Sequence, residues 1–279
     1  MSPSRTLAIV ALTTTLVSCS APKVPETAAS EAQVTVRIVA TTATYPLALD
    51  LLTAYNTTVE PVRSSIQSTN FHAARRTMMR DPSLYMMTNA LPSDPDLWIA
   101  PIARDGIAVI VSDDVTVENL SLDQLRAIYQ GRITNWTQVG GDAGPIIVYS
   151  REEGSGTRVE FERMVMGPRP LNARARIAMS SQLMIEQIRA TPGSVGYVSS
   201  GFLRSSVRVL SIDNLLPDTT TIANDRYPLR TTIYLIGLTE PEPSIRAVFG
   251  WMQSLPGQVV VAQRFVPLNM LIDEDVQAE

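Results

Sequence analysis

The chain has 279 residues, of which 45% are hydrophobic and 18% charged, and its formal net charge is −4. This composition can bury a sizeable core, which excludes global disorder, and the length fits one large domain or two modest ones. The negative net charge argues against nucleic acid as a partner, so an anion site would depend on local N–H groups and a few arginines. The sequence contains one His and one Cys, which excludes a metal site built on a His pair and an internal disulfide.

The first 18 residues have the pattern of a short secretory signal peptide. Arg5 precedes an apolar stretch over residues 7–17, which is too brief to span a membrane as a mature helix. The ending Leu-Val-Ser-Cys resembles the bacterial lipobox, which implies that Cys19 becomes a lipidated N-terminus after cleavage. The alternative is an ordinary secreted protein with a stray Cys. Residues 19–33 are rich in Ala, Pro, Thr, Ser and Glu without apolar periodicity, and they predict a lipidated, disordered tether.

A strand and a helix are predicted directly after the tether. Residues 34–39 alternate as a half-buried strand and lead into Ala-Thr-Thr-Ala-Thr at 40–44. Pro46 suits a first helical position. The apolar face of this helix has the spacing i, i+3, i+4, i+7 and consists of Ala48, Leu51, Leu52 and Tyr55. The unit therefore has hydroxyl groups at its helix entrance.

More strands and another helix follow in the first part of the chain. Residues 61–66 predict a strand, and Ser-Thr-Asn at 68–70 opens a helix. Its apolar face is Phe71, Ala74 and Met78. His72 lies about one turn into that helix, where a lone His more often packs or faces water than binds a ligand. Residues 84–89 predict a short apolar strand, and residues 107–111 predict a fully buried one.

The rest of the chain alternates helices and strands. Ser121 and Gln124 form a capping box, Gly131 ends that helix, and Trp136 is expected to pack in the interior. The apolar stripe of the helix consists of Leu122, Leu125, Ile128 and Tyr129. Further strands are predicted at 146–149, 195–199, 207–212 and 233–236, and further helices after 158, at 182–190 and at 243–254. The acidic residues 273–279 predict a loose tail.

The stretch over residues 149–158 has the pattern of a site for a small anion. A strand, a glycine-rich turn and a helix aim free backbone N–H groups and a positive helix end at such a ligand. Gly156, like the glycine two places before it, allows the backbone to approach the ligand closely. Ser155 and Thr157 add hydroxyl donors, and Arg151 adds a planar fork that suits two oxygens of one oxyanion.

Simpler and catalytic interpretations of this loop compete with anion binding. Gly-Ser-Gly-Thr could be only a flexible turn with Ser155 as a helix N-cap. A Walker loop requires Lys after its second Gly, and the only Lys of the chain is Lys23. A nucleophile elbow requires Gly two places before Ser, where Glu153 stands. The two catalytic motifs therefore do not fit.

Four phrases together resemble the phosphate-binding proteins of bacterial phosphate ABC transporters. They are Arg-Glu-Glu-Gly-Ser-Gly-Thr-Arg at 151–158, Asp-Gly-Ile-Ala-Val-Ile-Val at 105–111, Gly-Arg-Ile-Thr-Asn-Trp at 131–136 with Val-Gly-Gly at 139–141, and Pro-Gly-Ser-Val-Gly-Tyr-Val at 192–198. The resemblance covers about residues 34–268 and implies an α/β, two-lobe periplasmic-binding-protein fold of type II. Each lobe would be a mixed sheet flanked by helices, with the ligand cleft between the lobes. Residues 34–111 plus 201–279 would form lobe 1, and residues 112–200 would form lobe 2.

The same resemblance implies which residues hold the anion. Thr-Thr-Ala-Thr-Tyr-Pro at 41–46 is similar to the family's first phosphate loop with Thr in place of Gly, so Thr44 would supply a hydroxyl and Tyr45 a backbone N–H; a plain N-cap is the alternative for Thr44. The family's next binding Ser corresponds to Ser68, without the glycines that normally surround it. In the central loop, the contacts fall on Arg151, Ser155, Gly156 and Thr157.

Asn89 occupies the place where many family members have an Asp that accepts the proton of hydrogen phosphate. A carboxylate repels a fully ionised oxyanion such as sulfate, and a buried mismatch of this kind is worth about 2 kcal/mol or more. An amide can turn either its C=O or its NH2 group inward, so it lacks that filter. Glu152 and Glu153 are expected to point away or to pair with Arg151 or Arg158.

The resemblance implies an extracytoplasmic lipoprotein that captures inorganic phosphate and delivers it to an ABC permease. It would be a monomer attached to the membrane through Cys19, with no cofactor, metal, nucleic acid or catalytic residue. The alternatives are a binder of another oxyanion, such as sulfate, molybdate or a phosphonate, and a surface sensor or adhesion lipoprotein with this fold. Hydrolysis is disfavoured because the chain has one His and neither a metal-ligand cluster nor a nucleophile elbow.

Overall fold

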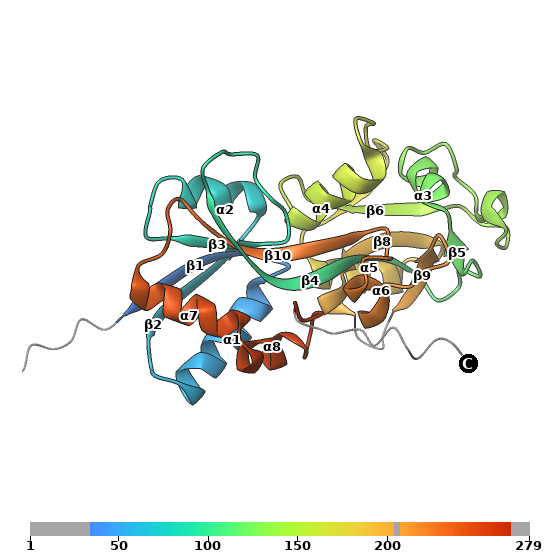
Figure 1. Cartoon of the computed structure of the whole chain (residues 1–279). Coiled ribbons are helices and arrows are strands. Elements are labelled where there is room, and N and C mark those ends of the chain that lie inside the picture. The colour runs from blue at the N-terminus through green and yellow to red at the C-terminus, as the bar shows by residue number, and fades with distance from the viewer. Residues whose placement is uncertain (1–33, 204–206, 269–279) are drawn as a thin grey trace, which may run out of the picture. The chain divides into compact units, whose positions relative to one another are not determined.

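The computed structural model describes residues 34–203 and 207–268 as a mixed α/β structure in which helices flank a curled sheet (Figure 1). The strands are β1 (Thr35–Thr41), β2 (Arg63–Thr69), β3 (Tyr85–Thr88), β4 (Trp98–Val111), β5 (Asn119–Leu120), β6 (Ile147–Arg151), β7 (Arg176–Ala178), β8 (Ser194–Ser199), β9 (Arg208–Ile212) and β10 (Arg230–Gly237). The α-helices are α1 (Tyr45–Thr58), α2 (Phe71–Met78), α3 (Leu122–Tyr129), α4 (Gly156–Phe161), α5 (Ser181–Ala190), α6 (Thr219–Ala223), α7 (Pro243–Gln253) and α8 (Leu255–Val261). Short 3-10 helices lie at η1 (Trp136–Val139) and η3 (Ser200–Phe202), and a π-helix, η2 (Glu162–Met166), continues α4.

The segments predicted at the two ends of the chain lie outside the described residues. These are the signal peptide, the lipidation site Cys19, the tether and the acidic tail. Within the described part, no helix combines the length and the apolar character that crossing a membrane requires.

The long strand β4 connects two parts of the sheet. The strand order is β2-β1-β3-β10-β4-β8-β6-β7, with β9 beside β4 and β5 beside β9. Residues 98–106 pair antiparallel with β10, and residues 107–111 pair antiparallel with β8 and partly with β9. We call β2, β1, β3, β10 and the start of β4 the first sheet part, and the end of β4 with β8, β6, β7, β9 and β5 the second sheet part. The lobe limits expected from the sequence stay a prediction.

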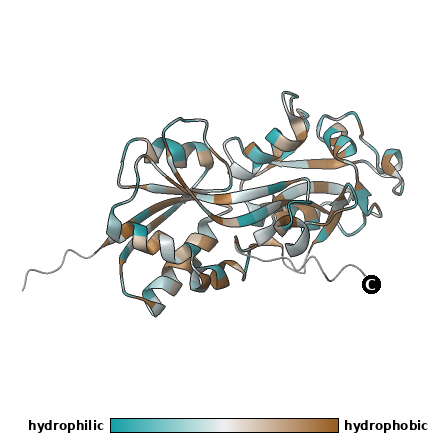
Figure 2. Ribbon diagram, in the orientation of Figure 1, coloured by the Kyte–Doolittle hydropathy of each residue, from teal (hydrophilic) through white to brown (hydrophobic). Residues whose placement is uncertain are grey.

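Helices cover both faces of the first sheet part. On one face α1, α7 and α8 pack together, and their hydrophobic residues gather where they meet one another and the strands (Figure 2). The predicted face of α1 is buried there, and the shared cluster includes Leu47, Leu51, Phe249 and Val261. The other face is covered by α2, with Phe71, Ala74 and Met78 packed on Val39 and Met86. The alternation of strand residues between the two clusters is the period-2 pattern of the sequence.

The second sheet part is also covered on both faces. The larger cluster joins β4, α3, the helix after the central loop and the segment 222–229, with Tyr129, Phe161 and Tyr197 at its centre. The rings of Phe161 and Tyr197 stack with centroids 4.0 Å apart. On the opposite face α5 packs Met184, Ile185 and Ile188 against Ile110 and Val198. Trp136 is buried, as predicted, and its indole N–H donates to the carbonyl of Gly193 at 3.0 Å.

Candidate functional site

The functional-site candidate lies where segments from both sheet parts meet. The backbone N–H of Phe71, at the start of α2, donates to the carbonyl of Gly154 at 2.7 Å. The side chain of Arg151 donates to Thr42 Oγ1 at 3.1 Å, and the amide of Asn89 donates to Thr157 Oγ1 at 3.4 Å. The turn before α1, the start of α2, the end of β3 and the loop between β6 and α4 therefore converge on one place.

Arg151 is the last residue of β6, and its side chain is fully buried, at 0% exposure. Its Nε and Nη2 donate to the two carboxylate oxygens of Glu152, at 2.8 and 3.0 Å. The prediction that Glu152 pairs with Arg151 is confirmed, and Glu153 is exposed. On the other edge of the guanidinium, Nη1 donates to Ser181 Oγ at 3.0 Å and Nη2 to Thr42 Oγ1 at 3.1 Å.

This arrangement determines which edge of the guanidinium is available to an anion. The edge formed by Nε and Nη2 is held by a carboxylate, because a planar fork matches two oxygens bidentately. The edge formed by Nη1 and Nη2 faces only the neutral hydroxyl groups of Ser181 and Thr42. An oxyanion therefore gains more at this edge than at the edge already held by the Glu152 carboxylate, because charge-assisted hydrogen bonds are about twice as strong as neutral ones.

The start of α4 presents donors next to this guanidinium. Ser155 is the N-cap, and its Oγ accepts from the N–H of Arg158 at 3.4 Å, which leaves its own proton available for a ligand. Ser155 can therefore cap the helix and donate to an anion at the same time, although these two roles are alternatives on sequence alone. The backbone N–H groups of Gly156 and Thr157 donate to no acceptor among the described residues, as expected in a first helical turn. We call Arg151, Ser155, Gly156 and Thr157 the anion cradle.

Gly156 is required where it stands because a side chain would collide with the first sheet part. A Cβ atom at this position would lie 2.7 Å from Asn89 Oδ1 and 3.5 Å from Thr88 Oγ1. The missing side chain thus allows the start of α4 to approach the end of β3 directly. Gly154, the other glycine of the loop, has a positive φ of 86° and lies against His72. The exposed His72 therefore borders the site at the second residue of α2.

Thr44 and Tyr45 lie at the start of α1 and face this convergence from the first sheet part. Thr44 is fully buried and makes no side-chain cap; instead its hydroxyl donates to the carbonyl of Met87 at 2.7 Å. The Thr44 hydroxyl can therefore donate to a ligand only if it gives up its hydrogen bond to Met87. The backbone N–H of Tyr45 donates to no acceptor among the described residues, which fits the predicted role of this amide.

Ser68 stands apart from the other predicted residues. It is exposed on the edge strand β2, and its side chain makes no hydrogen bond to the described residues. The N-cap of α2 is Asn70, whose carboxamide accepts from Ala73 N–H at 2.8 Å and lies beside Gly154. The contact between α2 and the central loop is thus made by Asn70 and Phe71, and the role of Ser68 stays a prediction.

Asn89 is 1% exposed and sits between the two sheet parts. Its NH2 group donates to Thr157 Oγ1 at 3.4 Å, whereas its Oδ1 is buried without a hydrogen-bond partner. A buried acceptor without a partner costs about 1–3 kcal/mol, so this oxygen is an unsatisfied group that a protonated ligand oxygen could satisfy. The contact between Asn89 and a ligand oxygen stays a prediction.

Sequence reasoning missed several residues that hold the guanidinium in place. Thr42 lies in the hydroxyl-rich turn that was noted, but which hydroxyl would reach Arg151 could not be read from spacing. Ser181 comes from α5, about 30 residues further along the chain. Tyr197 accepts from the backbone N–H of Arg151 at 3.3 Å and shares a hydrogen bond of 2.9 Å with Ser150. Burial raises the pKa of Tyr197 to about 12, so its hydroxyl stays protonated at neutral pH.

Comparisons with known proteins identify the family and similar folds. A family model described as a PBP superfamily domain matches residues 26–255. The phosphate-binding protein PstS of Bacillus subtilis (strain 168) is 34% identical over 183 residues, which cover 64% of this chain and 60% of that protein. PstS of Borreliella burgdorferi is 24% identical over 174 residues, and the match covers 58% of this chain and 62% of that protein. The matched segments thus span less than two thirds of these relatives.

Solved structures with the same fold identify the fold class. A substrate-binding protein of phosphate ABC transport from Clostridium perfringens, with bound phosphate, has a TM-score of 0.78 and 26% identity, and the match covers 84% of this chain and 99% of that one. An ABC-type phosphate transport receptor from Vibrio cholerae has a TM-score of 0.72 and 23% identity over 83% of this chain and 99% of that one. The predicted type II periplasmic-binding-protein fold is confirmed. With a family model matched over most of its length, the chain belongs to the PBP superfamily.

Proposed function

We propose that this protein is an extracytoplasmic solute-binding protein that captures inorganic phosphate and presents it to the permease of an ABC transporter. The single observation that carries the proposal is the buried guanidinium of Arg151, whose Nη1 and Nη2 edge faces only neutral hydroxyls beside the free amides of Gly156 and Thr157. The relatives to which the chain is similar include phosphate-binding proteins, which supports phosphate as the anion.

In this proposal the ligand takes its contacts from both sheet parts. Arg151 supplies the charge-assisted hydrogen bonds, and Ser155, Gly156 and Thr157 supply neutral donors, while Thr44, Tyr45 and Ser68 form the opposing wall and Asn89 contacts one ligand oxygen. Only an arrangement with the sheet parts close together makes all these contacts, so binding is coupled to closure about a hinge. The lobe limits 34–111 with 201–279, and 112–200, belong to this part of the proposal.

Attachment and delivery rest on the sequence resemblance alone. The lipobox-like ending implies a lipid on Cys19 after removal of the signal peptide, so the protein would be held at the outer side of the cytoplasmic membrane as a monomer. Delivery to a permease belongs to the same resemblance, and the name of the Clostridium perfringens neighbour, a phosphate ABC transporter substrate-binding protein, supports it. Metabolic labelling with a palmitate analogue, compared with a Cys19→Ala variant, tests the anchor.

Calorimetric titration with inorganic phosphate tests the binding function. We expect saturable binding by the wild-type protein and a loss of about 2 kcal/mol, or roughly 30-fold in affinity, in Arg151→Ala. Arg174→Ala is the matched control, because Arg174 is exposed and its side chain forms no ion pair within the described residues. Equal affinity of the Arg151→Ala variant and the control would remove Arg151 from the site.

Asn89 favours a second candidate in the same class, a binder of another oxyanion. Its buried Oδ1 can accept a hydrogen bond from the hydroxyl group of hydrogen phosphate, but a carboxamide lacks the negative charge that would exclude sulfate. Thermal shift with phosphate, sulfate, molybdate and methylphosphonate separates the candidates, because the preferred anion raises the melting temperature most. The absence of stabilisation by every anion would favour a protein that has lost ligand binding.

A further inference from the structure

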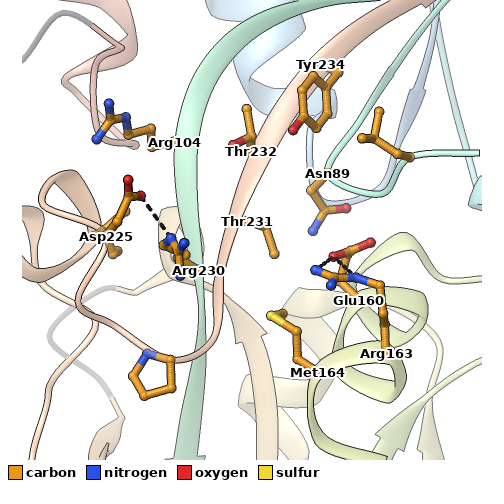
Figure 3. Close-up of a pocket in the computed structure, with 13 residues that line it drawn as sticks. Asn89, Arg104, Glu160, Arg163, Met164, Asp225, Arg230, Thr231, Thr232 and Tyr234 are labelled. Carbon is orange, nitrogen blue, oxygen red and sulfur yellow. Dashed lines mark hydrogen bonds and ion pairs between the residues drawn. The ribbon is translucent and has the colours of Figure 1, made fainter. Parts of the chain in front are cut away.

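A cavity of about 770 Å³ is lined by Asn89, by Glu160 and by residues of β10 (Figure 3). Asn89, which contacts Thr157 of the cradle, also lines this cavity. The same helix supplies both places: α4 begins with Gly156 in the cradle, and Glu160, one turn further on, lines the cavity. The cavity and the cradle are therefore neighbours that share a helix and a side chain.

The size of the cavity suits an organic group. Pockets for organic molecules have volumes of about 300–1,000 Å³, and a water molecule occupies about 30 Å³ of liquid volume. A single inorganic anion in the cradle leaves this space to water alone. The cavity is also hydrophilic, since most of its lining side chains are charged or carry hydroxyl or amide groups.

Two residues of the cavity lining each have a buried oxygen without a hydrogen-bond partner among the described residues. Asn89 Oδ1 and Thr231 Oγ1 belong to residues that are 1% and 7% exposed, and neither oxygen makes a hydrogen bond to the described residues. Both residues line the cavity. Buried polar groups in folded proteins are almost always hydrogen-bonded, so turning these side chains toward a donor in the cavity would satisfy both oxygens.

Glu160 adds an acceptor at the same place. It is 7% exposed, and both hydrogen bonds from Arg163, at 3.0 and 2.7 Å, end on its Oε2. Its Oε1 accepts no hydrogen bond from the described residues. Carboxylate oxygens accept strongly from hydroxyl groups, and Thr232 and Tyr234 add hydroxyls of their own across the cavity (Figure 3). The acceptors are therefore matched to a ligand that carries several hydroxyls.

The charges at the cavity allow a negatively charged ligand to enter. Glu160 is paired with Arg163, and Asp225 is paired with Arg230 at 2.9 Å. Arg104, the remaining charged residue of the lining, donates to the carbonyl of Ala223 and has no acidic partner among the described residues. The lining thus carries one net positive charge.

We propose that the site takes phosphate monoesters of small polyols, with the phosphate group in the cradle and the hydroxyl-bearing group in the cavity beside Glu160. This inference rests on the proposed function, because the cradle must first bind phosphate. The ester group passes Asn89, whose carboxamide lies at the boundary of the two spaces. The chemical class follows from the acceptors at the cavity and from its position beside the cradle.

Calorimetric titration of the whole protein with sn-glycerol 3-phosphate and, separately, with inorganic phosphate tests this proposal. We expect the wild-type protein to bind both ligands. Glu160→Gln should lower the affinity for sn-glycerol 3-phosphate about tenfold more than it lowers the affinity for inorganic phosphate, because the strongest hydroxyl acceptor of the cavity becomes neutral. Glu186→Gln is the matched control, since Glu186 is exposed on α5.

A second variant fills the cavity. Thr232 is half-buried on its lining, and Thr232→Phe should exclude the ester while inorganic phosphate still binds, which also shows that the variant folds. Binding of inorganic phosphate without binding of the ester by the wild-type protein would overturn this proposal and leave the proposed function intact. Ester binding unchanged in both variants would overturn the assignment to the cavity. Failure of both ligands to bind would overturn the proposed function itself.

Discussion

Arg151 donates a hydrogen bond of 3.1 Å from Nη2 to Oγ1 of Thr42, and this bond joins the end of β6 to the turn between β1 and α1. The two residues belong to different sheet parts and are separated by 109 positions in the sequence. Together with Glu152 on the opposite edge, Thr42 sets the direction of a guanidinium that has no access to bulk water. The position of the Arg151 guanidinium therefore depends on how closely the two sheet parts lie together.

The variant Thr42→Val tests this link. Valine keeps the branched shape but cannot accept the hydrogen bond, and the net value of such a bond is about 1 kcal/mol. We expect phosphate affinity to fall about fivefold in calorimetry, with little change in thermal stability. Thr57→Val is the matched control, because the exposed Thr57 hydroxyl only donates to the backbone of its own helix. Identical affinities in the two variants would show that Thr42 does not direct the guanidinium.

Gly156→Ala should keep the sheet parts from approaching each other. The added Cβ would lie 2.7 Å from Asn89 Oδ1, closer than real contacts allow, and Asn89 is buried and so has little room to move. We expect phosphate affinity to fall by at least about tenfold, which is 1.4 kcal/mol, while the fold remains intact. Gly144→Ala is the control, since its Cβ would meet nothing within 4 Å. Asn89→Ala by itself removes a proposed ligand contact, so a double variant Gly156→Ala with Asn89→Ala that binds more tightly than Gly156→Ala alone would identify the collision as the cause.

Periodicity predicted most of the fold because its strong signals coincide with burial. The stripe of α1 and the capping box of Ser121 and Gln124 occur as expected, and both reciprocal hydrogen bonds of that box form. The start of β4 was missed because Pro101 interrupts the pattern. In the structure Ala103 is opposite Ile233 and Pro101 is opposite Tyr234, so a bulge at this point accommodates the proline.

Helix α8 was missed for a related reason. Pro256 and Gly257 suggest a turn, yet proline is favourable in a first helical turn. The glycine is needed there because a Cβ atom would lie 2.3 Å from the carbonyl oxygen of Trp251. Such close packing between α7 and α8 depends on the tertiary structure, so it cannot be predicted from the local sequence.

The candidate site was predictable where one loop supplies several groups. The phrase at 151–158 places Arg151, Ser155 and Gly156 together by chain connectivity alone. Contacts between distant segments were harder to predict. The contacts of Arg151 with Thr42 and Ser181 depend on how the strands pair, which the sequence does not show. Ser68 was placed by resemblance without the flanking glycines. In the structure it is exposed, whereas Asn70, two residues further on, meets the central loop.

Asp105 gives the protein a predictable dependence on pH. It is fully buried in β4, just before the point where β4 changes partners from β10 to β8. Burial raises its pKa to about 6, and hydrogen bonds from Ser199, Ser200 and the N–H of Gly106 act in the opposite direction. Because this pKa lies above that of the unfolded chain, the folded protein holds a proton between about pH 4 and pH 6 that the unfolded chain releases.

The contribution of Asp105 to stability is therefore complete below about pH 4 and is lost as the pH rises through 6. Asp105→Asn removes this titration. The difference of about two pKa units corresponds to roughly 3 kcal/mol, by which the variant should gain on the wild type between pH 4 and pH 7. Urea unfolding of both proteins across that range measures the change. A constant difference between the two curves would show that Asp105 titrates normally.

Asn89→Asp should sharpen the choice between phosphate and sulfate. The amide oxygen of Asn89 is buried without a partner, and its NH2 group contacts Thr157 of the cradle. A carboxylate at this place would accept the proton of hydrogen phosphate and repel sulfate, which has none to give at neutral pH. A buried mismatch of this kind is worth about 2 kcal/mol or more, so the ratio of phosphate to sulfate affinity should rise roughly 30-fold at pH 7.

Titration calorimetry with both anions measures that ratio in the wild type and in the variant. Asn119→Asp is the control, because it adds the same charge in β5, away from the cradle, and should leave the ratio unchanged. The two affinities together distinguish general charge repulsion from recognition of the proton. General repulsion by the new carboxylate would weaken the binding of both anions equally, whereas proton recognition weakens the binding of sulfate alone. Equal discrimination by the wild type and Asn89→Asp would mean that residue 89 does not contact a ligand oxygen.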